Sequence, residues 1–123
     1  MNNPFLVQVE SKQKFIDSFE LQNMKSKEIK IQCFTDEFDI RLPIMENGEI
    51  KFHYSHFIHD ILDAENTLFF FKGFSEISTH TQQVILESLL SNNEHSNKIC
   101  FLIKDFDNLN IDAAIANKFI IIR

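Results

Sequence analysis

Hydrophobic positions in the first third of the chain form short strand-like runs and one helical stripe. Residues 5–9 are almost continuously apolar, which predicts a short buried strand. Residues 12–20 carry apolar side chains on one helical face and mostly charged ones off it, which predicts an amphipathic helix. Residues 28–34 alternate between apolar and polar side chains, a pattern typical of a half-exposed strand at the edge of a sheet.

A β-hairpin is predicted over residues 39–54. Apolar residues alternate on both sides of Asn47-Gly48, and this dipeptide is the strongest short-range hairpin signal. Pro43 lacks a backbone N–H, so it has to occupy an unpaired edge position. The apolar spacing then changes, and residues 55–63 carry a helical stripe made of Phe57, Ile58, Ile61 and Leu62.

The second half of the chain predicts two buried strands with a helix between them, followed by a short helix and a last strand. The strands cover residues 67–71, 99–103 and 119–122, and the helices cover residues 79–91 and 111–116. Thr79 and Gln82 fit a capping box at the start of the first of these helices.

These elements predict one α/β domain over residues 1–123. Continuous apolar strands are typical of parallel sheets covered on both faces, and helices lie between them in the sequence. We therefore expect a three-layer sandwich, with a mostly parallel five-stranded sheet and helices on both faces. A chain of 123 residues is long enough for a single hydrophobic core.

Composition excludes several classes of function. A net charge of −6 with no basic stripe is not what a nucleic-acid-binding protein requires. No apolar stretch is long enough for a transmembrane helix, and no signal peptide is visible. Cys33 and Cys100 stand alone inside apolar runs, which predicts small buried residues in a reducing compartment. We therefore expect a cytoplasmic protein with no direct nucleic-acid or membrane partner.

Glycine is scarce, with only Gly48 and Gly73 in the whole chain. A phosphate-binding loop needs several glycines, because its backbone N–H groups must converge on the anion. No Gly-x-x-x-x-Gly-Lys-Ser/Thr motif occurs. The sequence therefore predicts no nucleotide site of this type, and we expect no cofactor.

Residues 64–90 resemble the AAA+ ATPase core of bacterial sigma-54 activators, the enhancer-binding proteins. In that family a Gly-Thr-Leu-Phe strand leads to an acidic pair, a Gly-Glu-Leu-Pro-like turn, and a helix with a glutamine and paired leucines. This chain has Thr67-Leu68-Phe69, then Ser75-Glu76-Ile77, then Gln83, Leu86 and Leu89-Leu90. Residues 111–123 are similar to the family's short helix and last strand. The resemblance implies a P-loop-type AAA+-like sandwich, and it places the alternating strand at a sheet edge.

The departures from the family fall at its catalytic positions. The Walker A region is reduced to Val9, Glu10, Ser11, Lys12 and Lys14, without the glycine turn. Lys72-Gly73 replaces the Walker B acidic pair, although Mg²⁺ needs oxygen ligands. Asp105 or Asp107 lies near the polar sensor position, and Asn117-Lys118 stands where an arginine finger would be. The sigma-54-contacting loop and the helical lid domain are also missing.

Histidines and aspartates around residue 56 allow a metal interpretation. His56 with Asp60, and His59 with Asp63, are i, i+4 pairs on one helix face, and such a face can hold zinc. The alternative is a solvated helix face whose imidazoles titrate near neutral pH. A metal-dependent enzyme centred on these residues is therefore one hypothesis, although we expect no bound metal.

The resemblance and its departures together predict a non-catalytic AAA+-like domain that binds protein, in connection with transcription regulation. Such a domain is not an enzyme, and its partner is another protein or a second copy. A clamp-loader subunit similar to delta-prime is an alternative, because residues 82–90 and 115–119 also resemble that protein. The apolar last strand, residues 119–122, needs a covering partner in either case.

Overall fold

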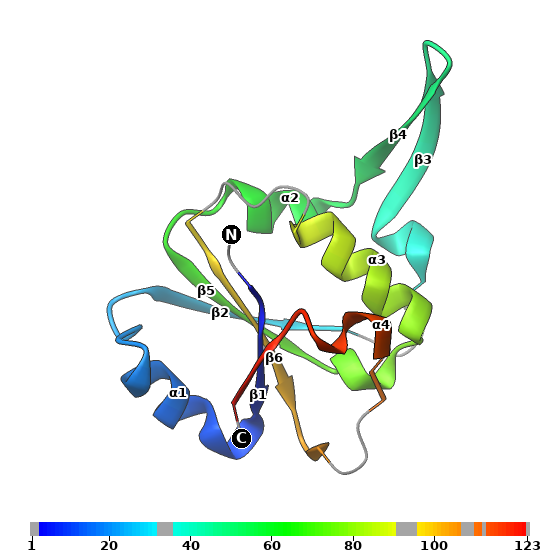
Figure 1. The fold of residues 1–123 in the computed structure, drawn as a ribbon. Helices are drawn as coiled ribbons and strands as arrows, with labels where there is room; N and C mark the ends of the chain where they lie inside the picture. The colour runs from blue at the N-terminus through cyan, green and yellow to red at the C-terminus, as the bar shows by residue number, and fades with distance from the viewer. Residues whose placement is uncertain (1–2, 32–35, 91–95, 107–109, 112, 123) are drawn as a thin grey trace.

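A computed structural model describes residues 3–31, 36–90, 96–106, 110–111 and 113–122. Its main sheet has five parallel strands in the order β2-β5-β6-β1-β7 (Figure 1). The strands are β1 (Phe5–Gln8), β2 (Lys25–Lys30), β5 (Thr67–Lys72), β6 (Lys98–Ile103) and β7 (Ile120–Ile122). The predicted five-stranded sheet is confirmed, and the alternating strand β2 lies at an edge, as expected.

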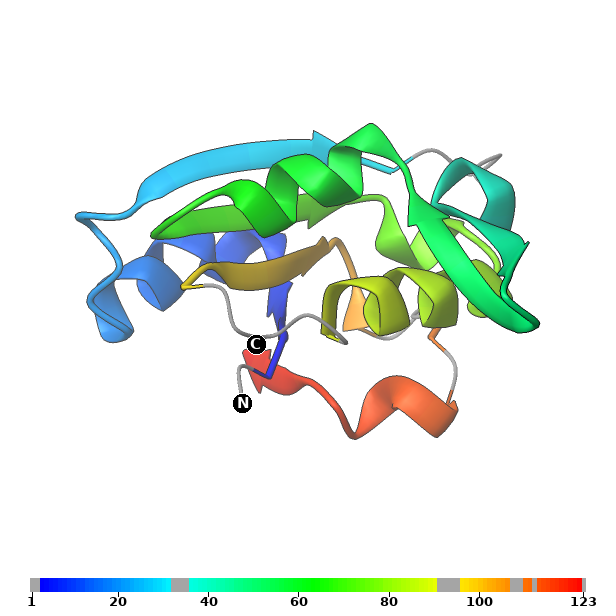
Figure 2. The same cartoon turned by 90° about the horizontal axis from the view of Figure 1, so that it is seen from above.

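Helices cover both faces of the sheet, which confirms the three-layer α/β sandwich. They are α1 (Lys12–Ser18), α2 (His56–Asp63), α3 (Thr79–Leu90) and α4 (Ala113–Ala116). Figure 2 shows α1 on one side of the sheet, with α3 and α4 on the other. Among the described residues, no helix combines the length and the apolar character needed to cross a bilayer.

Two apolar cores follow from the alternation of side chains along the buried strands. Phe69 and Phe71 of β5 pack in the core beneath α2 and α3. Leu68 and Phe70 point the other way, into a smaller core that contains Phe15 of α1. Successive strand residues point to opposite faces, so one apolar run supplies both cores.

The predicted hairpin is confirmed as β3 (Arg41–Glu46) and β4 (Glu49–Tyr54), which form a separate two-stranded sheet. It projects from the body of the domain (Figure 1). Asn47 and Gly48 have φ values of 51° and 80°, as a tight hairpin turn requires. Hydrogen-bonded and non-hydrogen-bonded pairs alternate along the hairpin, beginning with the hydrogen-bonded pair Glu46 and Glu49. Pro43 belongs to a non-hydrogen-bonded pair, so its missing N–H falls on the open side of β3.

Two sequence predictions require correction. The edge strand begins at Lys25 instead of residue 28, because it pairs along the whole of β5, and residues 32–34 of the predicted strand lie outside the described residues. Thr79 and Gln82 do not form the predicted capping box: the hydroxyl of Ser78 accepts a hydrogen bond from the Thr81 N–H at 3.1 Å. The side-chain amide of Gln82 instead donates to the carbonyl oxygen of Phe74 at 3.0 Å.

Candidate functional site

A cleft of about 320 Å³ lies at the carboxyl ends of β1, β5 and β6. Parallel α/β sheets place their ligand sites at this edge. The cleft is lined by Val9, Lys72, Gly73, Ser75, Glu76, Leu102, Ile103, Lys104 and Asp105. The structure therefore brings Val9 together with Lys72 and Gly73 at the cleft, whereas Lys12 and Lys14 lie outside the cleft lining.

The chain turns sharply after β1, in the 3₁₀ helix η1 (Val9–Ser11), and α1 begins at once with Lys12. The backbone N–H of Lys12 donates to the carbonyl oxygen of Val9, inside this turn. A phosphate loop instead has free N–H groups that converge on an anion. The segment Val9, Glu10 and Ser11 is thus a closed turn, and the side chain of Ser11 makes no capping hydrogen bond.

Glu28 of β2 forms ion pairs with two lysines, Lys12 of α1 and Lys72 of β5. Its carboxylate lies 2.8 Å from the Nζ of Lys12 and 3.1 Å from the Nζ of Lys72. The hydrogen bond from Lys12, followed by that from Lys72, lowers the pKa of Glu28 below its usual value. Both cations are therefore compensated by a carboxylate of the chain itself, where an ATPase would present its cations to phosphate.

Gly73 has a backbone conformation and a surrounding that exclude a side chain. Its φ is +88°, in the left-handed region that disfavours residues with a Cβ. A Cβ at this position would also lie well inside van der Waals distance of the backbone oxygen of Ile31. The N–H of Ile31 donates to the carbonyl of Lys72 at 2.8 Å and holds this segment in place. A carboxylate therefore cannot stand at residue 73 without a shift of the backbone.

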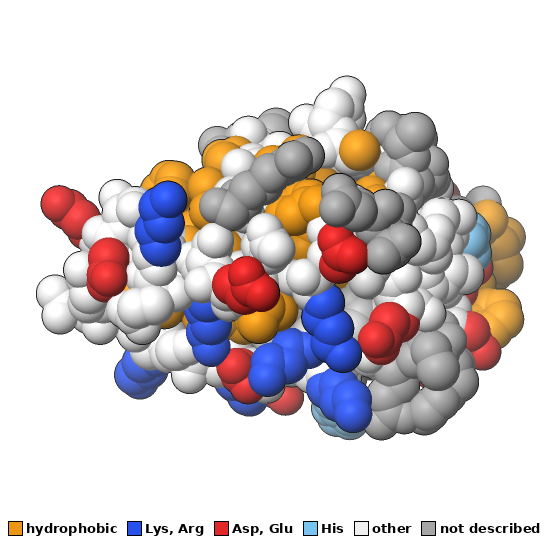
Figure 3. Space-filling model, turned by 90° about the horizontal axis from the view of Figure 1, so that it is seen from below, with side chains coloured by type: hydrophobic (Ala, Val, Ile, Leu, Met, Phe, Trp, Pro, Cys, Tyr) orange, Lys and Arg blue, Asp and Glu red, His pale blue; other side chains and the backbone are white. Residues whose placement is uncertain are grey.

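The remaining polar groups of the cleft carry both signs of charge. Lys104 and Asp105 follow β6, and Glu76 follows β5 in the 3₁₀ helix η3 (Phe74–Glu76). Figure 3 views this face of the molecule, where acidic and basic side chains lie close together. Asn117 and Lys118 do not line the cleft, and Asp107 lies outside the described residues.

The metal candidates are spread along an exposed helix face. His56, His59, Asp60 and Asp63 are all exposed on α2, while Ile58 and Ile61 are buried beneath them. An open pocket at the start of this helix is lined by Phe52, His53, Tyr54, Ser55, His56 and His59. Within the described part of the chain, no group of three or more His, Cys, Asp or Glu side chains could hold a metal ion. The structure offers no support for the metal-dependent enzyme.

The hairpin arm, residues 41–54, exposes apolar side chains away from the body. Its register pairs Pro43 with Phe52 and Met45 with Ile50, and cross-strand partners share a face. Met45 is 70% exposed and Ile50 is 65% exposed. The same register places Leu42 and Ile44 on the face opposite to Ile50 and Phe52. We call Pro43, Met45, Ile50 and Phe52 the apolar face of the arm.

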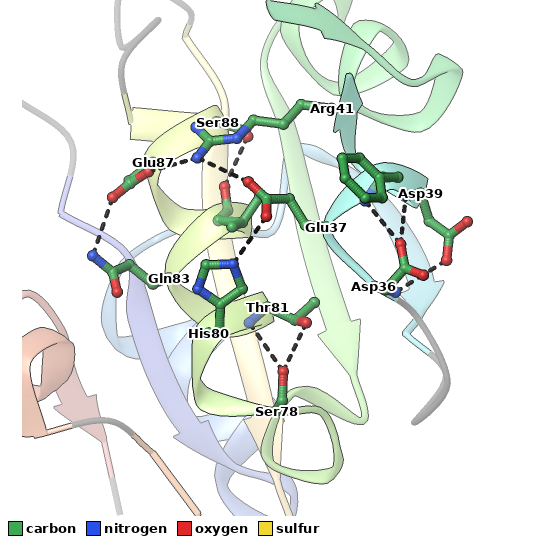
Figure 4. A network of polar contacts seen from close by, with 12 residues as sticks. Asp36, Glu37, Asp39, Arg41, Ser78, His80, Thr81, Gln83, Glu87 and Ser88 are labelled. Atoms are coloured by element: carbon green, nitrogen blue, oxygen red, sulfur yellow. Dashed lines mark hydrogen bonds and ion pairs between the residues drawn. The ribbon is translucent and has the colours of Figure 1, made fainter. Parts of the chain in front are cut away.

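The base of the arm is fastened to the body by Arg41 (Figure 4). The Arg41 guanidinium lies 3.1 Å from Glu87 of α3 and 3.6 Å from Glu37 of the 3₁₀ helix η2 (Glu37–Asp39). Its other contact is the ring of Phe52, 4.1 Å away. Glu37 also lies 3.0 Å from His80, and that hydrogen bond is the main reason why its pKa is lowered. The arm therefore leaves the body in a defined direction.

Sequence reasoning missed Glu28 and Arg41, the two residues that organise these sites. Glu28 belongs to an edge strand with several charged residues, so its spacing carries no distinguishing signal. Arg41 precedes the alternating run of the hairpin. Its partner Glu37 lies four residues before it in the sequence, and its partner Glu87 lies 46 residues after it. Contacts over such separations are fixed by the fold and not by a local pattern.

No family model matches the sequence, and no curated protein matches it.

Proposed function

We propose that this chain is an AAA+-like domain that has lost ATP hydrolysis and acts as a protein-binding regulatory module. The resemblance of residues 64–90 to sigma-54 activators makes transcription regulation the process that we propose for it. The proposal rests chiefly on one observation: Lys72-Gly73 stands at the end of β5, and Gly73 cannot accept a side chain there.

Phosphoryl transfer depends on positioned charge, so the chemistry at this edge decides whether hydrolysis is feasible. Mg²⁺ binds carboxylates, water and phosphate oxygens, and a lysine with a glycine supplies none of the protein ligands. Lys12 and Lys72 are already bound to Glu28. These contacts support a domain that neither binds Mg²⁺-ATP in the family's manner nor hydrolyses it.

The hairpin arm is the surface that we propose for the protein partner. It lies between β2 and β5, the interval in which sigma-54 activators carry the loop that contacts their partner. A two-stranded sheet with an uncovered apolar face is marginally stable by itself, and exposed apolar residues gathered in this way mark interaction sites. Glu46 and Glu49 flank the turn at the tip. The matching partner has an apolar groove with a basic end.

Loss of ATP chemistry is tested by calorimetric titration with ATP and with ADP in the presence of Mg²⁺, together with an assay of phosphate release. We expect no heat of binding at micromolar nucleotide and no release of phosphate above the buffer rate. Turnover that disappears in a Lys72→Ala variant, but persists in Lys51→Ala, would contradict the proposal.

The binding role of the arm is tested by affinity capture from lysate of the source cell, with quantitative mass spectrometry. A Met45→Glu/Ile50→Glu variant should lose the captured partner, and Ile121→Lys, which changes an exposed apolar residue elsewhere, should retain it. The recombinant partner should then bind the wild-type domain and not the arm variant. Capture that is equal for both variants would refute a role for the arm. Recovery of polymerase subunits would favour the clamp-loader alternative.

A further inference from the structure

The two edges of the main sheet differ in their chemistry. Four of the six residues of β2 are charged: Lys25, Lys27, Glu28 and Lys30. Charged side chains on an edge strand oppose pairing with another strand. The opposite edge strand, β7, consists of three isoleucines, of which Ile120 is 38% exposed and Ile121 is 49% exposed. Only the β2 edge is thus protected against strand addition.

The backbone of β7 presents one residue to the open side. The N–H of Ile120 donates to the carbonyl of Pro4 at 2.9 Å, so Ile120 faces β1. In a strand the N–H and C=O of one residue point to the same side, and the next residue points to the other. The N–H and C=O of Ile121 therefore point away from β1, at the outer edge of the sheet (Figure 2).

We propose that β7 pairs with β7 of a second copy of this chain, antiparallel, about a two-fold axis at Ile121. Ile121 then exchanges two N–H···O=C hydrogen bonds with Ile121 of the second copy. Ile120 lies opposite Ile122 on each side of the axis, so β-branched side chains face each other and no charges oppose. The pairing joins the two five-stranded sheets into one continuous sheet. This surface is distinct from the arm, so the proposal stands independently of the proposed function.

The apolar surface continues inward from the strand onto the α1 face. Phe5 is the register partner of Ile120, and its ring centroid lies 5.2 Å from that of the exposed Phe19. A contact built on one three-residue strand is small, so we expect a weak dimer with a Kd on the order of 100 µM.

The first test is sedimentation of the whole chain at concentrations from about 5 to about 500 µM, a range that brackets this Kd. The weight-average mass should rise from 14.5 kDa toward twice that value. Ile121→Pro should stay monomeric and folded, because proline is tolerated where an edge N–H faces outward. Ile121→Lys should also stay monomeric, and Ile50→Lys on the arm should dimerise like the wild type. A constant mass of 14.5 kDa for the wild type, or an unchanged Kd in both Ile121 variants, overturns the proposal.

The second test fixes the register. Antiparallel residues that exchange two hydrogen bonds have Cα atoms about 5.5 Å apart, within reach of a disulfide. In a Cys33→Ser background, Ile121→Cys should therefore form an intermolecular disulfide under mild oxidation, at least about tenfold faster than the exposed control Ile50→Cys. Equal rates in the two variants would show random collision and refute a two-fold axis at Ile121.

Discussion

Replacing Gly73 by alanine tests whether the backbone around residue 73 excludes a side chain. Alanine adds one methyl group and no charge, so it separates steric exclusion from the electrostatics of Lys72. The matched control is Gly48→Ala in the hairpin turn. Gly48 has a φ of +80°, close to the +88° of Gly73, but a Cβ added to it would meet no atom within 4 Å.

The two substitutions share one energetic term and differ in a second. An alanine held in the left-handed region costs about 1–2 kcal/mol in either turn. Both variants also lose the same unfolded-chain entropy, which cancels in the comparison. Only Gly73→Ala forces the backbone of Ile31 to move, and overpacking of this kind costs about 1–3 kcal/mol. We therefore expect a loss of about 2–5 kcal/mol for Gly73→Ala and about 1–2 kcal/mol for Gly48→Ala.

The free energy of unfolding is measured by urea titration, followed by circular dichroism and by a second probe to test two-state behaviour. A difference of about 2 kcal/mol between the variants corresponds to roughly 8 °C in Tm for a chain of this size. Equal losses in the two variants, or a larger loss for Gly48→Ala, would refute the steric argument. A carboxylate could then be placed at residue 73 by substitution.

Three further predictions concern Glu28, Arg41 and Cys100. Glu28 has a folded-state pKa below its usual 4.5, so its ion pairs stabilise the domain above that pH and are lost as the pH falls. In a plot of unfolding free energy against pH, Glu28→Gln should therefore flatten the acid side, and Glu10→Gln should not. Arg41→Ala removes two partly exposed ion pairs and a cation–π contact, together worth about 1–2 kcal/mol. The rate of amide hydrogen exchange in residues 42–54 should therefore rise by about tenfold, while the rate in β6 stays unchanged. The control Lys51→Ala should have little effect on either rate. Burial raises the pKa of the Cys100 thiol. In a Cys33→Ser background, iodoacetamide should therefore label Cys100 only after unfolding in guanidinium chloride. Labelling of the native protein at the rate of a free thiol would contradict this.

The sheet could be predicted from the sequence because the apolar runs of its strands directly indicate which segments are buried. Thr67–Lys72 and Lys98–Ile103 are the central strands β5 and β6, and their continuous apolar runs require cover on both faces. The alternation in residues 28–34 and the Asn47-Gly48 signal are equally local, and both indicated the correct element. Strand limits were less accurate, because β2 takes its length from its pairing with β5.

The candidate sites were predictable only where a residue type itself forbids the chemistry. Lys72 at the end of β5 excludes an acidic ligand in any fold, so its position in the cleft could be expected. The steric exclusion of a side chain at Gly73 could not be predicted, because it depends on the approach of Ile31, which follows the neighbouring strand β2. The outward direction of the Ile121 backbone likewise depends on which residue of β7 bonds to Pro4. A run of identical isoleucines does not indicate which residues form hydrogen bonds to the neighbouring strand and which point to the open edge.

The contacts that fix Lys72 and Gly73 both come from one pair of neighbouring strands, β2 and β5. Glu28 of β2 binds Lys72 of β5, and the backbone just after β2 lies against Gly73. An acidic residue at position 72 would therefore face Glu28 and repel it, while any side chain at position 73 would displace Ile31. The ion pair at Lys72 and the close approach at Gly73 thus belong to the same contact between β5 and the segment that contains β2 and Ile31. We therefore propose that the fold itself keeps this cleft non-catalytic, and that the arm and the β7 edge are the surfaces through which the domain acts.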